Sequence, residues 1–454
     1  MFFPNESIVR SGFFSNFAAL KLLLLKVKKD YIELNPWQYL ILSFFILIAL
    51  GTLLLKLPFV THTNGLTFID SVFTSTSAVC VTGLTTVPTS GFNWVGKGVL
   101  LLMMQLGAIG IMTLSSSLIL ALRGKISLKD KISFFRTQED SSLHDINNIL
   151  RFVVFITFVT ELIGAAILTI GFSYQGLPFI GAVEQGVFHS VSAFCNAGFS
   201  TYDTSLVGMN ALIKYTVMGL IIVGGIGYHV IYEVFGKFNS KAKYSLHTKV
   251  VLFTTIILIV GGALLIYIFE TGHISITDSL FQSVTARTAG FNTVDITKMH
   301  YLGLFFMSLL MFIGASPGST GGGIKTTTFF IVMVALIKIL RGNNNVVVFN
   351  RYIPNKVILK SFAIMSAYFM VAFIATLALL YHNDDGFLKT LFEIISAIGT
   401  VGLSLGVSAQ VGIYGKIILI LTMFIGRVGP ASVAMLISSN DKNINIKYPE
   451  ESIY

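Results

Sequence analysis

The sequence predicts an all-α integral membrane protein in which four helix–pore loop–helix repeats surround a central pore. Three observations predict this fold class: an apolar composition, eight apolar segments of spanning length, and a glycine motif that occurs four times. Of the 454 residues, 54% are hydrophobic and only 11% are charged. A soluble domain is usually about 25% charged. The bilayer is therefore the better solvent for this chain.

Eight segments are apolar over the roughly 20 residues that a helix needs to cross a bilayer. The sixth is too long for one straight crossing and contains a glycine-rich break. A semi-apolar stretch lies between spans one and two, three and four, five and six, and seven and eight. Each stretch is too short to cross the bilayer and is typical of a re-entrant helix. The predicted spans are 37–58, 95–122, 149–173, 208–236, 247–270, 299–340, 355–382 and 413–438.

The distribution of basic residues predicts the orientation in the membrane. Of the 31 Lys and Arg residues, 22 fall in the segments on one side, six on the other side, and three at membrane depth. The positive-inside rule then places both termini in the cytoplasm. Because this distribution explains the net charge of +10, we expect no nucleic-acid binding. The two cysteines, Cys80 and Cys195, lie in apolar segments and indicate no disulfide framework.

The repeat is carried by four short segments that each contain a glycine followed by Leu or Phe and then a small polar residue. These glycines are Gly83, Gly198, Gly290 and Gly402, and the segments begin at Ser77, Ser192, Val284 and Ser396. The predicted organisation is an amino-terminal cytoplasmic segment and four repeats followed by a cytoplasmic tail. The corresponding ranges are 1–36, 37–122, 149–236, 247–340, 355–438 and 439–454.

A second glycine group follows each motif glycine at nearly one spacing. The groups begin at Gly107, Gly224, Gly314 and Gly426, which lie 24, 26, 24 and 24 residues after the respective motif glycine. A single glycine pair in a membrane helix is ordinarily a packing feature. Four groups at one spacing from four matching segments indicate an internal fourfold repeat.

These segments have the residues that a cation-binding loop requires. Backbone carbonyls can replace the water around a cation if the chain is extended and turned toward an axis, and glycine permits the dihedral angles needed. The carboxyl end of each re-entrant helix would favour a cation electrostatically. No Asp or Glu adjoins the key glycines, so the sequence predicts a ring of carbonyls and no bound cofactor.

The motifs resemble those of the Trk/Ktr/HKT superfamily of potassium transporters, in particular the membrane subunits of bacterial Ktr systems. The most specific part is 314–328, Gly-Ala-Ser-Pro-Gly-Ser-Thr-Gly-Gly-Gly-Ile-Lys-Thr-Thr-Thr, which is similar to that family's intramembrane gating loop. The resemblance implies a potassium-channel-like architecture in a bacterial plasma membrane, with potassium as substrate and sodium as a candidate activator. It also implies a homodimer surrounded by membrane lipids, and a ring of separate cytoplasmic regulatory subunits that bind ATP, ADP or NAD.

The resemblance assigns site residues by matching position. In this family glycine in every repeat accompanies potassium preference, whereas serine in the first accompanies sodium, and here all four positions are glycine. The implied filter residues are Val81, Thr82, Gly83, Asn196, Ala197, Gly198, Thr288, Ala289, Gly290, Thr400, Val401 and Gly402, with potassium at the carbonyls of the four glycines. The implied gate residues are Gly314, Ser316, Pro317, Gly318, Ser319, Thr320, Gly321, Gly322, Gly323, Lys325 and Arg427.

Charged residues at membrane depth are costly and are functional candidates. We expect Arg427 to donate to carbonyls of the glycine-rich loop, and Arg287 to support the third loop from behind. Lys325 has an alternative in snorkelling to the interface. Glu161 is expected to pair with a neighbouring helix. Asp70 and Glu184 are expected near the starts of re-entrant helices, where an anion suits the helix dipole.

Other functions fit the sequence less well. Residues 318–326 have the look of a phosphate-binding loop, but Ile324 separates the last glycine from Lys325 and no strand precedes them. We therefore do not expect an enzyme. An alternating-access symporter would show two larger repeats with paired broken helices, whereas only one long helix is predicted to break here. A sodium-selective or less selective cation transporter remains an alternative.

Overall fold

The computed structural model describes residues 36–62, 65–121, 143–237, 243–270, 273–343, 345–383 and 385–430. The predicted amino-terminal segment, the tail and the end of the eighth predicted span lie outside these residues. In the described part, each predicted apolar span coincides with one or two helices. The prediction of an all-α chain needs one small correction, because a two-stranded antiparallel hairpin follows the third repeat. It pairs β1 (Val347–Val348) with β2 (Arg351–Tyr352).

Repeat 1 places a short helix between two longer ones, and in repeat 2 the middle helix has 16 residues, half the length of the first helix and equal to the third. In repeat 1 the short helix α3 is capped by Thr67, whose hydroxyl accepts the Asp70 N–H. Repeat 1 consists of α2 (Pro36–Leu55), α3 (Phe68–Val79), η1 (Thr89–Gly91) and α4 (Trp94–Ala121). Repeat 2 consists of α6 (Leu143–Tyr174), α7 (Phe179–Phe194), α8 (Ala211–Ile226) and α9 (Tyr228–Lys237).

The prediction of one continuous helix over 208–236 was wrong. The chain bends by 97° between α8 and α9, at Gly227, whose φ of +96° is left-handed. A side chain on Gly227 would also clash with the carbonyl oxygen of Pro317. Glycine is required there for both conformation and space.

Repeats 3 and 4 have the same plan, with one interruption in repeat 3. Its last helix is divided into α12 and α13 by the non-helical residues 313–325, as the glycines and Pro317 predict. Repeat 3 consists of α10 (Leu246–Phe269), α11 (Ile276–Thr285), η3 (Ile296–Lys298), α12 (Tyr301–Phe312) and α13 (Thr326–Leu340). Repeat 4 consists of α14 (Asn355–His382), α15 (Phe387–Gly399), α16 (Val407–Gln410) and α17 (Ile413–Val428).

By length and apolar character, three described helices can each cross a membrane. They cover Arg151–Tyr174, Leu246–Phe269 and Asn355–His382, and the bent α8–α9 pair adds a fourth candidate. Their outward faces carry large apolar side chains such as Phe155, Leu162 and Phe373. Such faces suit lipid contact.

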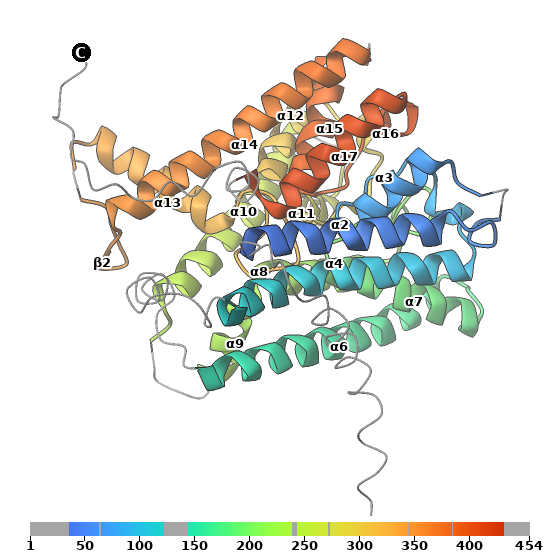
Figure 1. Ribbon diagram of the computed structural model, residues 1–454, viewed down its shortest axis with the longest axis horizontal. Coiled ribbons are helices and arrows are strands. Elements are labelled where there is room, and N and C mark those ends of the chain that lie inside the picture. The colour runs from blue at the N-terminus through green and yellow to red at the C-terminus, as the bar shows by residue number, and fades with distance from the viewer. Residues whose placement is uncertain are drawn as a thin grey trace, which may run out of the picture.

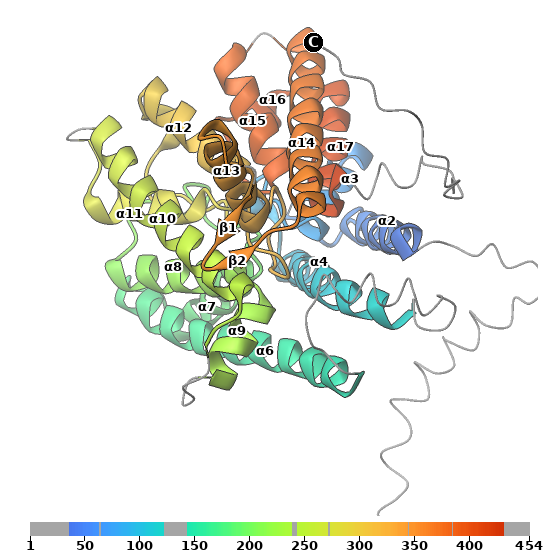
Figure 2. The ribbon, with the colours of Figure 1, turned by 90° about the vertical axis from the view of Figure 1, so that its left-hand side faces the viewer.

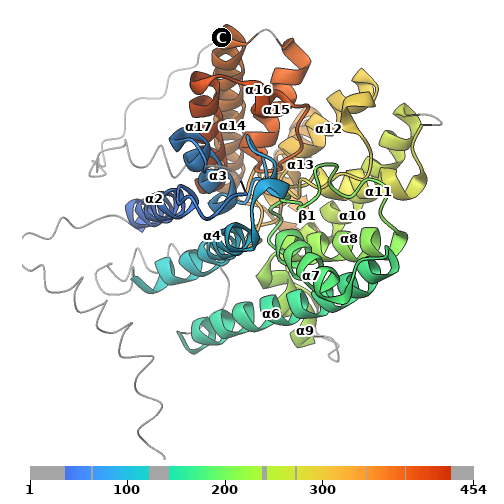
Figure 3. The same cartoon turned by 90° about the vertical axis from the view of Figure 1, so that its right-hand side faces the viewer.

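Helices α2, α4 and α6 lie side by side in Figure 1, whereas α14 runs obliquely to them. The four repeats follow one another around a common centre in Figures 2 and 3, from blue through green and yellow to red. Each short helix packs on the first helix of its own repeat and on the helix that directly follows the motif loop of the preceding repeat. Thus α3 contacts α17, α7 contacts α4, α11 contacts α8, and α15 contacts α12. This cyclic packing brings the carboxyl ends of the four short helices together.

Candidate functional site

The four motif glycines form a closed ring at the centre of the repeats. A side chain on Gly83 would clash with the Ala197 carbonyl oxygen, one on Gly198 would approach that of Ala289, and one on Gly290 would clash with that of Val401. Gly402 completes the ring against the Thr82 carbonyl oxygen. The structure thus brings all twelve residues of the predicted filter into one site, in the order of the repeats.

The backbone of the four loops follows one pattern. The motif glycines have φ values of +93°, +72°, +81° and +95° in repeats 1 to 4. Two positions earlier, Val81, Asn196, Thr288 and Thr400 also have positive φ, between 52° and 78°. Left-handed backbone is unfavourable for non-glycine residues, and most of all for a β-branched one such as Val81. The same uncommon conformation in four loops indicates that the surrounding structure imposes it.

Hydroxyl groups at the ends of the short helices hold the loops in this conformation. Ser77 and Ser396 accept hydrogen bonds from the N–H groups of Gly83 and Gly402, both at 3.0 Å. Ser192 and Thr285 instead donate to the carbonyls of Phe199 and Phe291, at 2.8 and 2.7 Å. Sequence reasoning did not assign this role. Its signal was present, because a hydroxyl residue lies five or six positions before each motif glycine.

The second glycine groups support the loops from below in three repeats. A side chain on Gly107, Gly224 or Gly426 would clash with a carbonyl oxygen near the end of a short helix, namely that of Val79, Phe194 or Ile398. In repeat 3 the corresponding Gly314 instead lies against the Gly322 carbonyl. The spacing recognised in the sequence therefore reflects close backbone contact.

Residues 313–325 cross the site beneath the third and fourth loops. The Gly322 N–H donates to the Thr400 hydroxyl at 2.9 Å, and a side chain on Gly321 would clash with the Thr288 hydroxyl. Buried backbone polar groups require partners, and protein groups supply them here. Ser316 N–H donates to the Gly225 carbonyl at 3.0 Å, and Thr320 N–H donates to that of Gly224 at 3.2 Å.

Within this segment the predicted hydroxyl groups are buried and engaged. The Ser316 hydroxyl lies 2.9 Å from that of Thr326, and the Ser319 hydroxyl donates to the Ser316 carbonyl at 2.6 Å. The Thr320 hydroxyl donates to the Phe194 carbonyl at 3.2 Å. Lys325 Nζ donates to the Gly321 carbonyl at 2.8 Å, which places its charge against the segment and not at a distant interface.

The Arg427 side chain joins the segment to two other repeats. Its guanidinium group donates to the carbonyl of Thr320 and, at 2.7 Å, to that of Gly107. The Tyr368 hydroxyl, which sequence reasoning missed, lies 3.3 and 3.2 Å from the carbonyl oxygens of Gly323 and Gly426 and can donate its one proton to either. Nothing in the spacing of the α14 residues distinguishes Tyr368 from an ordinary aromatic side chain.

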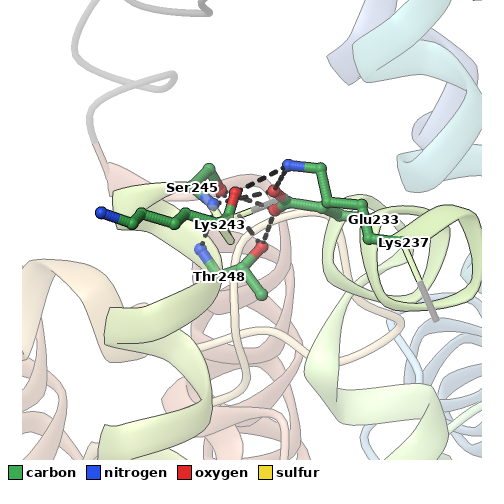
Figure 4. Close-up of polar contacts among 5 residues, drawn as sticks. All are labelled: Glu233, Lys237, Lys243, Ser245 and Thr248. Atoms are coloured by element: carbon green, nitrogen blue, oxygen red, sulfur yellow. Dashed lines mark hydrogen bonds and ion pairs between the residues drawn. The ribbon is translucent and has the colours of Figure 1, made fainter. Parts of the chain in front are cut away.

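The same segment contacts the helix bend of repeat 2. The Tyr228 N–H donates to the Gly318 carbonyl at 3.0 Å, and the Tyr228 ring packs against Gly318. The other end of α9 is tied to the start of α10 by Glu233, which accepts from Lys237, Ser245 and Thr248 (Figure 4). A chain of direct contacts thus leads from the glycine-rich segment to the α9–α10 junction.

The other membrane-depth charges are buried beside the loops. Glu161 accepts from the Gln105 amide at 3.1 Å, so it pairs with a neighbouring helix. Arg287 is 6% exposed, and its Nε has no hydrogen-bond partner among the described residues. Cys195 contacts Gln105 and Glu161, and both cysteines are free and buried.

Acidic residues of the first three short helices form ion pairs with the preceding repeat in ring order. Asp70 pairs with Lys416 at 2.6 Å, Glu184 with Lys97 at 2.9 Å, and Asp278 with Lys214 at 2.7 Å. Asp70 lies in the first turn of α3, whereas Glu184 is the sixth residue of α7, past its first turn, so only Asp70 is placed directly at the end of the helix dipole.

The charge partners also affect ionisation. Burial by itself raises the pKa of Asp70, but hydrogen bonds from Lys416 and Thr67 outweigh it, so the pKa lies below its ordinary value. The same balance, with Lys214 and Ser275 as donors, lowers the pKa of Asp278. Both carboxylates therefore carry negative charge at neutral pH.

Comparison with known proteins identifies the family. The family model TrkH, described as a cation transport protein, matches residues 6–446. The chain belongs to the TrkH family. Members of this family are cation transporters, so the protein is a membrane transporter and not an enzyme.

Individual TrkH-family relatives are similar over nearly their whole length. The chain is 35% identical to the Ktr system potassium uptake protein B of Bacillus subtilis, covering 93% of this chain and 97% of that protein. It is 34% identical to the potassium/sodium uptake protein NtpJ of Enterococcus hirae, with coverages of 93% and 97%. The crystal structure of the potassium transporter TrkH from Vibrio parahaemolyticus has the same fold, with a TM-score of 0.73 at 18% identity and coverages of 93% and 89%.

Proposed function

We propose that the protein carries potassium across the bacterial plasma membrane through the ring formed by the four motif glycines. The observation that carries this proposal is the closed ring itself, in which each glycine lies against the backbone just before the next. Four loops with one backbone conformation can present carbonyl oxygens to one cation. Potassium is then the substrate, and the relatives named as potassium uptake proteins support this choice.

The proposed architecture has eight crossings, with both termini in the cytoplasm. It includes four re-entrant helices, of which α3, α7, α11 and α15 are the candidates. Residues 314–328 are proposed as a gate held by Arg427. Separate nucleotide-binding subunits would control this gate from the cytoplasm, and the relatives named as parts of a Ktr system support such a partner. A homodimer and activation by sodium complete the proposal.

The decisive experiment is rescue of a potassium-uptake-deficient cell at low potassium, with rubidium and sodium uptake measured alongside. The Gly290→Ser variant should lose preference for rubidium over sodium, because a side chain there strains the backbone and clashes within the ring. Gly208→Ser is the matched control. Gly208 has a φ of +78°, but no described atom lies within 4 Å of the added carbon.

Rescue by the wild type and by Gly208→Ser, with loss of preference in Gly290→Ser, would support the proposal. An unchanged preference in a well-expressed Gly290→Ser protein would show that the ring does not select the ion. Absence of potassium uptake by both the wild type and Arg427→Ala, in which the proposed gate is released, would remove potassium as the substrate.

A second candidate function is uptake of sodium together with potassium, which the name of the Enterococcus relative favours. Measurement of ion flux into liposomes distinguishes conduction of potassium through the ring from symport of sodium and potassium. A conducting ring gives fast flux that is linear in the driving force, whereas a symporter gives slow, saturating exchange that requires both ions.

A further inference from the structure

Two of the four loops are braced from behind by a buried side chain of the short helix. Glu393 in α15 accepts a hydrogen bond from the Ser404 hydroxyl at 2.9 Å, and His189 in α7 lies 3.0 Å from the Ser200 hydroxyl. Glu393 and His189 each lie nine residues before the motif glycine, and the serines lie two residues after it. The two contacts are therefore the same contact in repeats 4 and 2.

The Glu393 carboxylate meets only donors. Its Oε1 also accepts the Ser408 N–H at 3.0 Å, and its Oε2 accepts the Leu405 N–H at 3.3 Å. An ionised carboxylate accepts hydrogen bonds and donates none, so all of these contacts suit it. Glu393 is fully buried, and it fixes the chain directly after the fourth loop.

His189 performs the same role with a different side chain. Its Nδ1 lies 2.9 Å from the Gln185 carbonyl, which can only accept, so Nδ1 donates. Nε2 of a neutral ring then accepts from the Ser200 hydroxyl. In both repeats the serine oxygen accepts in turn from the backbone four residues after the glycine, at Tyr202 (3.2 Å) and Gly406 (2.9 Å).

Repeats 1 and 3 lack this brace. The corresponding residues are Thr74 and Phe281. Thr74 is fully buried, and its hydroxyl has no hydrogen-bond partner among the described residues. Phe281 has no polar group. Because the glycines follow one another around the ring in the order of the repeats, the braced loops lie opposite each other and alternate with unbraced ones.

We propose that Glu393 and His189 are positioning residues that set the ion preference of the ring by fixing the outer ends of loops 4 and 2. The inference rests on the proposed function, because it assumes that the ring binds the transported cation. A carbonyl ring discriminates between ions through its size and the field of its dipoles. Both depend on how firmly each loop is held, and hydrogen bonds behind the loop supply that restraint.

The test uses the full chain in the potassium-uptake-deficient cell and measures the ratio of rubidium to sodium uptake. Glu393→Gln keeps the shape of the side chain but turns an amide N–H toward backbone donors. Ser404→Ala removes the donor and leaves the remaining Glu393 contacts. We expect each to lower the ratio about tenfold, which corresponds to ~1.4 kcal/mol. The double variant should be no worse than the stronger single one, because both break the same link.

Thr74→Val is the matched control, since it changes the same position in repeat 1 and removes a hydroxyl that bonds to nothing in the described structure. It should leave the ratio unchanged. If Glu393→Gln does not accumulate, Ser404→Ala and Ser200→Ala decide the question. A wild-type ratio in well-expressed Ser404→Ala and Ser200→Ala proteins would overturn the proposal. Absence of rubidium uptake by both the wild type and Arg427→Ala would instead contradict the proposed function.

Discussion

The loops that carry the four motif glycines are close copies of one another, whereas the helices that follow them end in three different ways. Each loop has left-handed backbone at the motif glycine and two residues before it. In repeat 1, α4 continues as a helix through its second glycine group to Ala121, whereas in repeat 3 α12 ends at Phe312, before Gly314. In repeats 2 and 4, α8 and α17 end alike at the last glycine of the group, where Gly227 and Gly429 have φ values of +96° and +90°.

In the proposed cation pathway, this difference follows from what each region must do. A ring that replaces the water around one ion needs similar oxygen ligands from every side, so the four loops share one geometry. A gate needs only one element with two arrangements. The proposed gate uses repeat 3 for that element, and repeats 1, 2 and 4 supply the surface that holds it. Variants of the holding contacts test this division.

Arg427→Ala should have the largest effect on the inner region. It removes two buried, charge-assisted hydrogen bonds, to Thr320 and Gly107, each worth roughly 1.5–3 kcal/mol. Potassium flux into liposomes through the chain alone should rise by about tenfold or more. Deletion of residues 318–323 should raise it as well.

Arg427→Lys is the control. A lysine keeps the positive charge but lacks the planar guanidinium group, whose N–H groups point in fixed directions toward both carbonyls. It should give an intermediate flux. If flux in Arg427→Ala stays the same or falls with folding intact, the glycine-rich segment is a passive kink and the division between ring and gate fails.

The loops around the motif glycines could be predicted from the sequence because their geometry depends on a short local motif. The glycine with left-handed φ recurs four times, and this recurrence distinguishes the loops from ordinary turns. The break in repeat 3 was equally accessible, since Pro317 and the neighbouring glycines disfavour a helix. The contact between Arg427 and the segment also followed from the repeat, which placed Arg427 at the depth of the glycines.

The contacts that were missed depend on which helices become neighbours. Gly227 looks like part of the ordinary second glycine group, and only the approach of Pro317 shows why the chain bends there. Tyr368, Glu393 and His189 lie on helices whose apolar pattern is unremarkable at those positions. The partners of Tyr368 are distant in sequence. Glu393 and His189 stand at one spacing from their partner serines, but the two side chains differ in type, so the sequence pattern does not show that they make the same contact.

Thr400→Val should have a smaller effect of the same sign. The Gly322 N–H loses its acceptor, and an unsatisfied buried donor costs about 1–3 kcal/mol. The segment is then less firmly held, so liposome flux should rise several-fold while remaining below that of Arg427→Ala. Thr376→Val is the control, because that hydroxyl bonds within its own helix, to Ala372. A flux equal to that of the wild type would remove Thr400 from the holding surface.

Glu233→Gln should loosen the junction between α9 and α10 without changing the ring. Glu233 accepts the Ser245 N–H at 2.8 Å and pairs with Lys237 at 2.7 Å. Loss of a helix-capping contact costs about 1 kcal/mol. Hydrogen exchange should therefore quicken at the start of α10 and, through Tyr228, in the segment around Gly318. Lys237→Met, which keeps the Ser245 contact, should show the smaller change; equal protection in both variants and the wild type would argue against this connection.

The smallest effect is expected at the outer ion pairs, which test whether the symmetric region extends to the surface. The pKa of Asp70 is lowered in the folded protein. Its pair with Lys416 therefore stabilises the fold above the unfolded-state pKa of about 4, and this contribution is lost as the pH falls through the folded value. Partly exposed pairs contribute at most about 1 kcal/mol. Asp70→Asn should lower the melting temperature slightly at pH 7, and the melting temperature of the variant should fall less than that of the wild type as the pH is lowered.

Lys389→Gln is the control in repeat 4, where an exposed lysine stands thirteen residues before Gly402, as Asp70 does before Gly83. If Lys389→Gln lowers the melting temperature as much as Asp70→Asn does, the outer pairs are ordinary surface charges and the fourfold order ends at the loops.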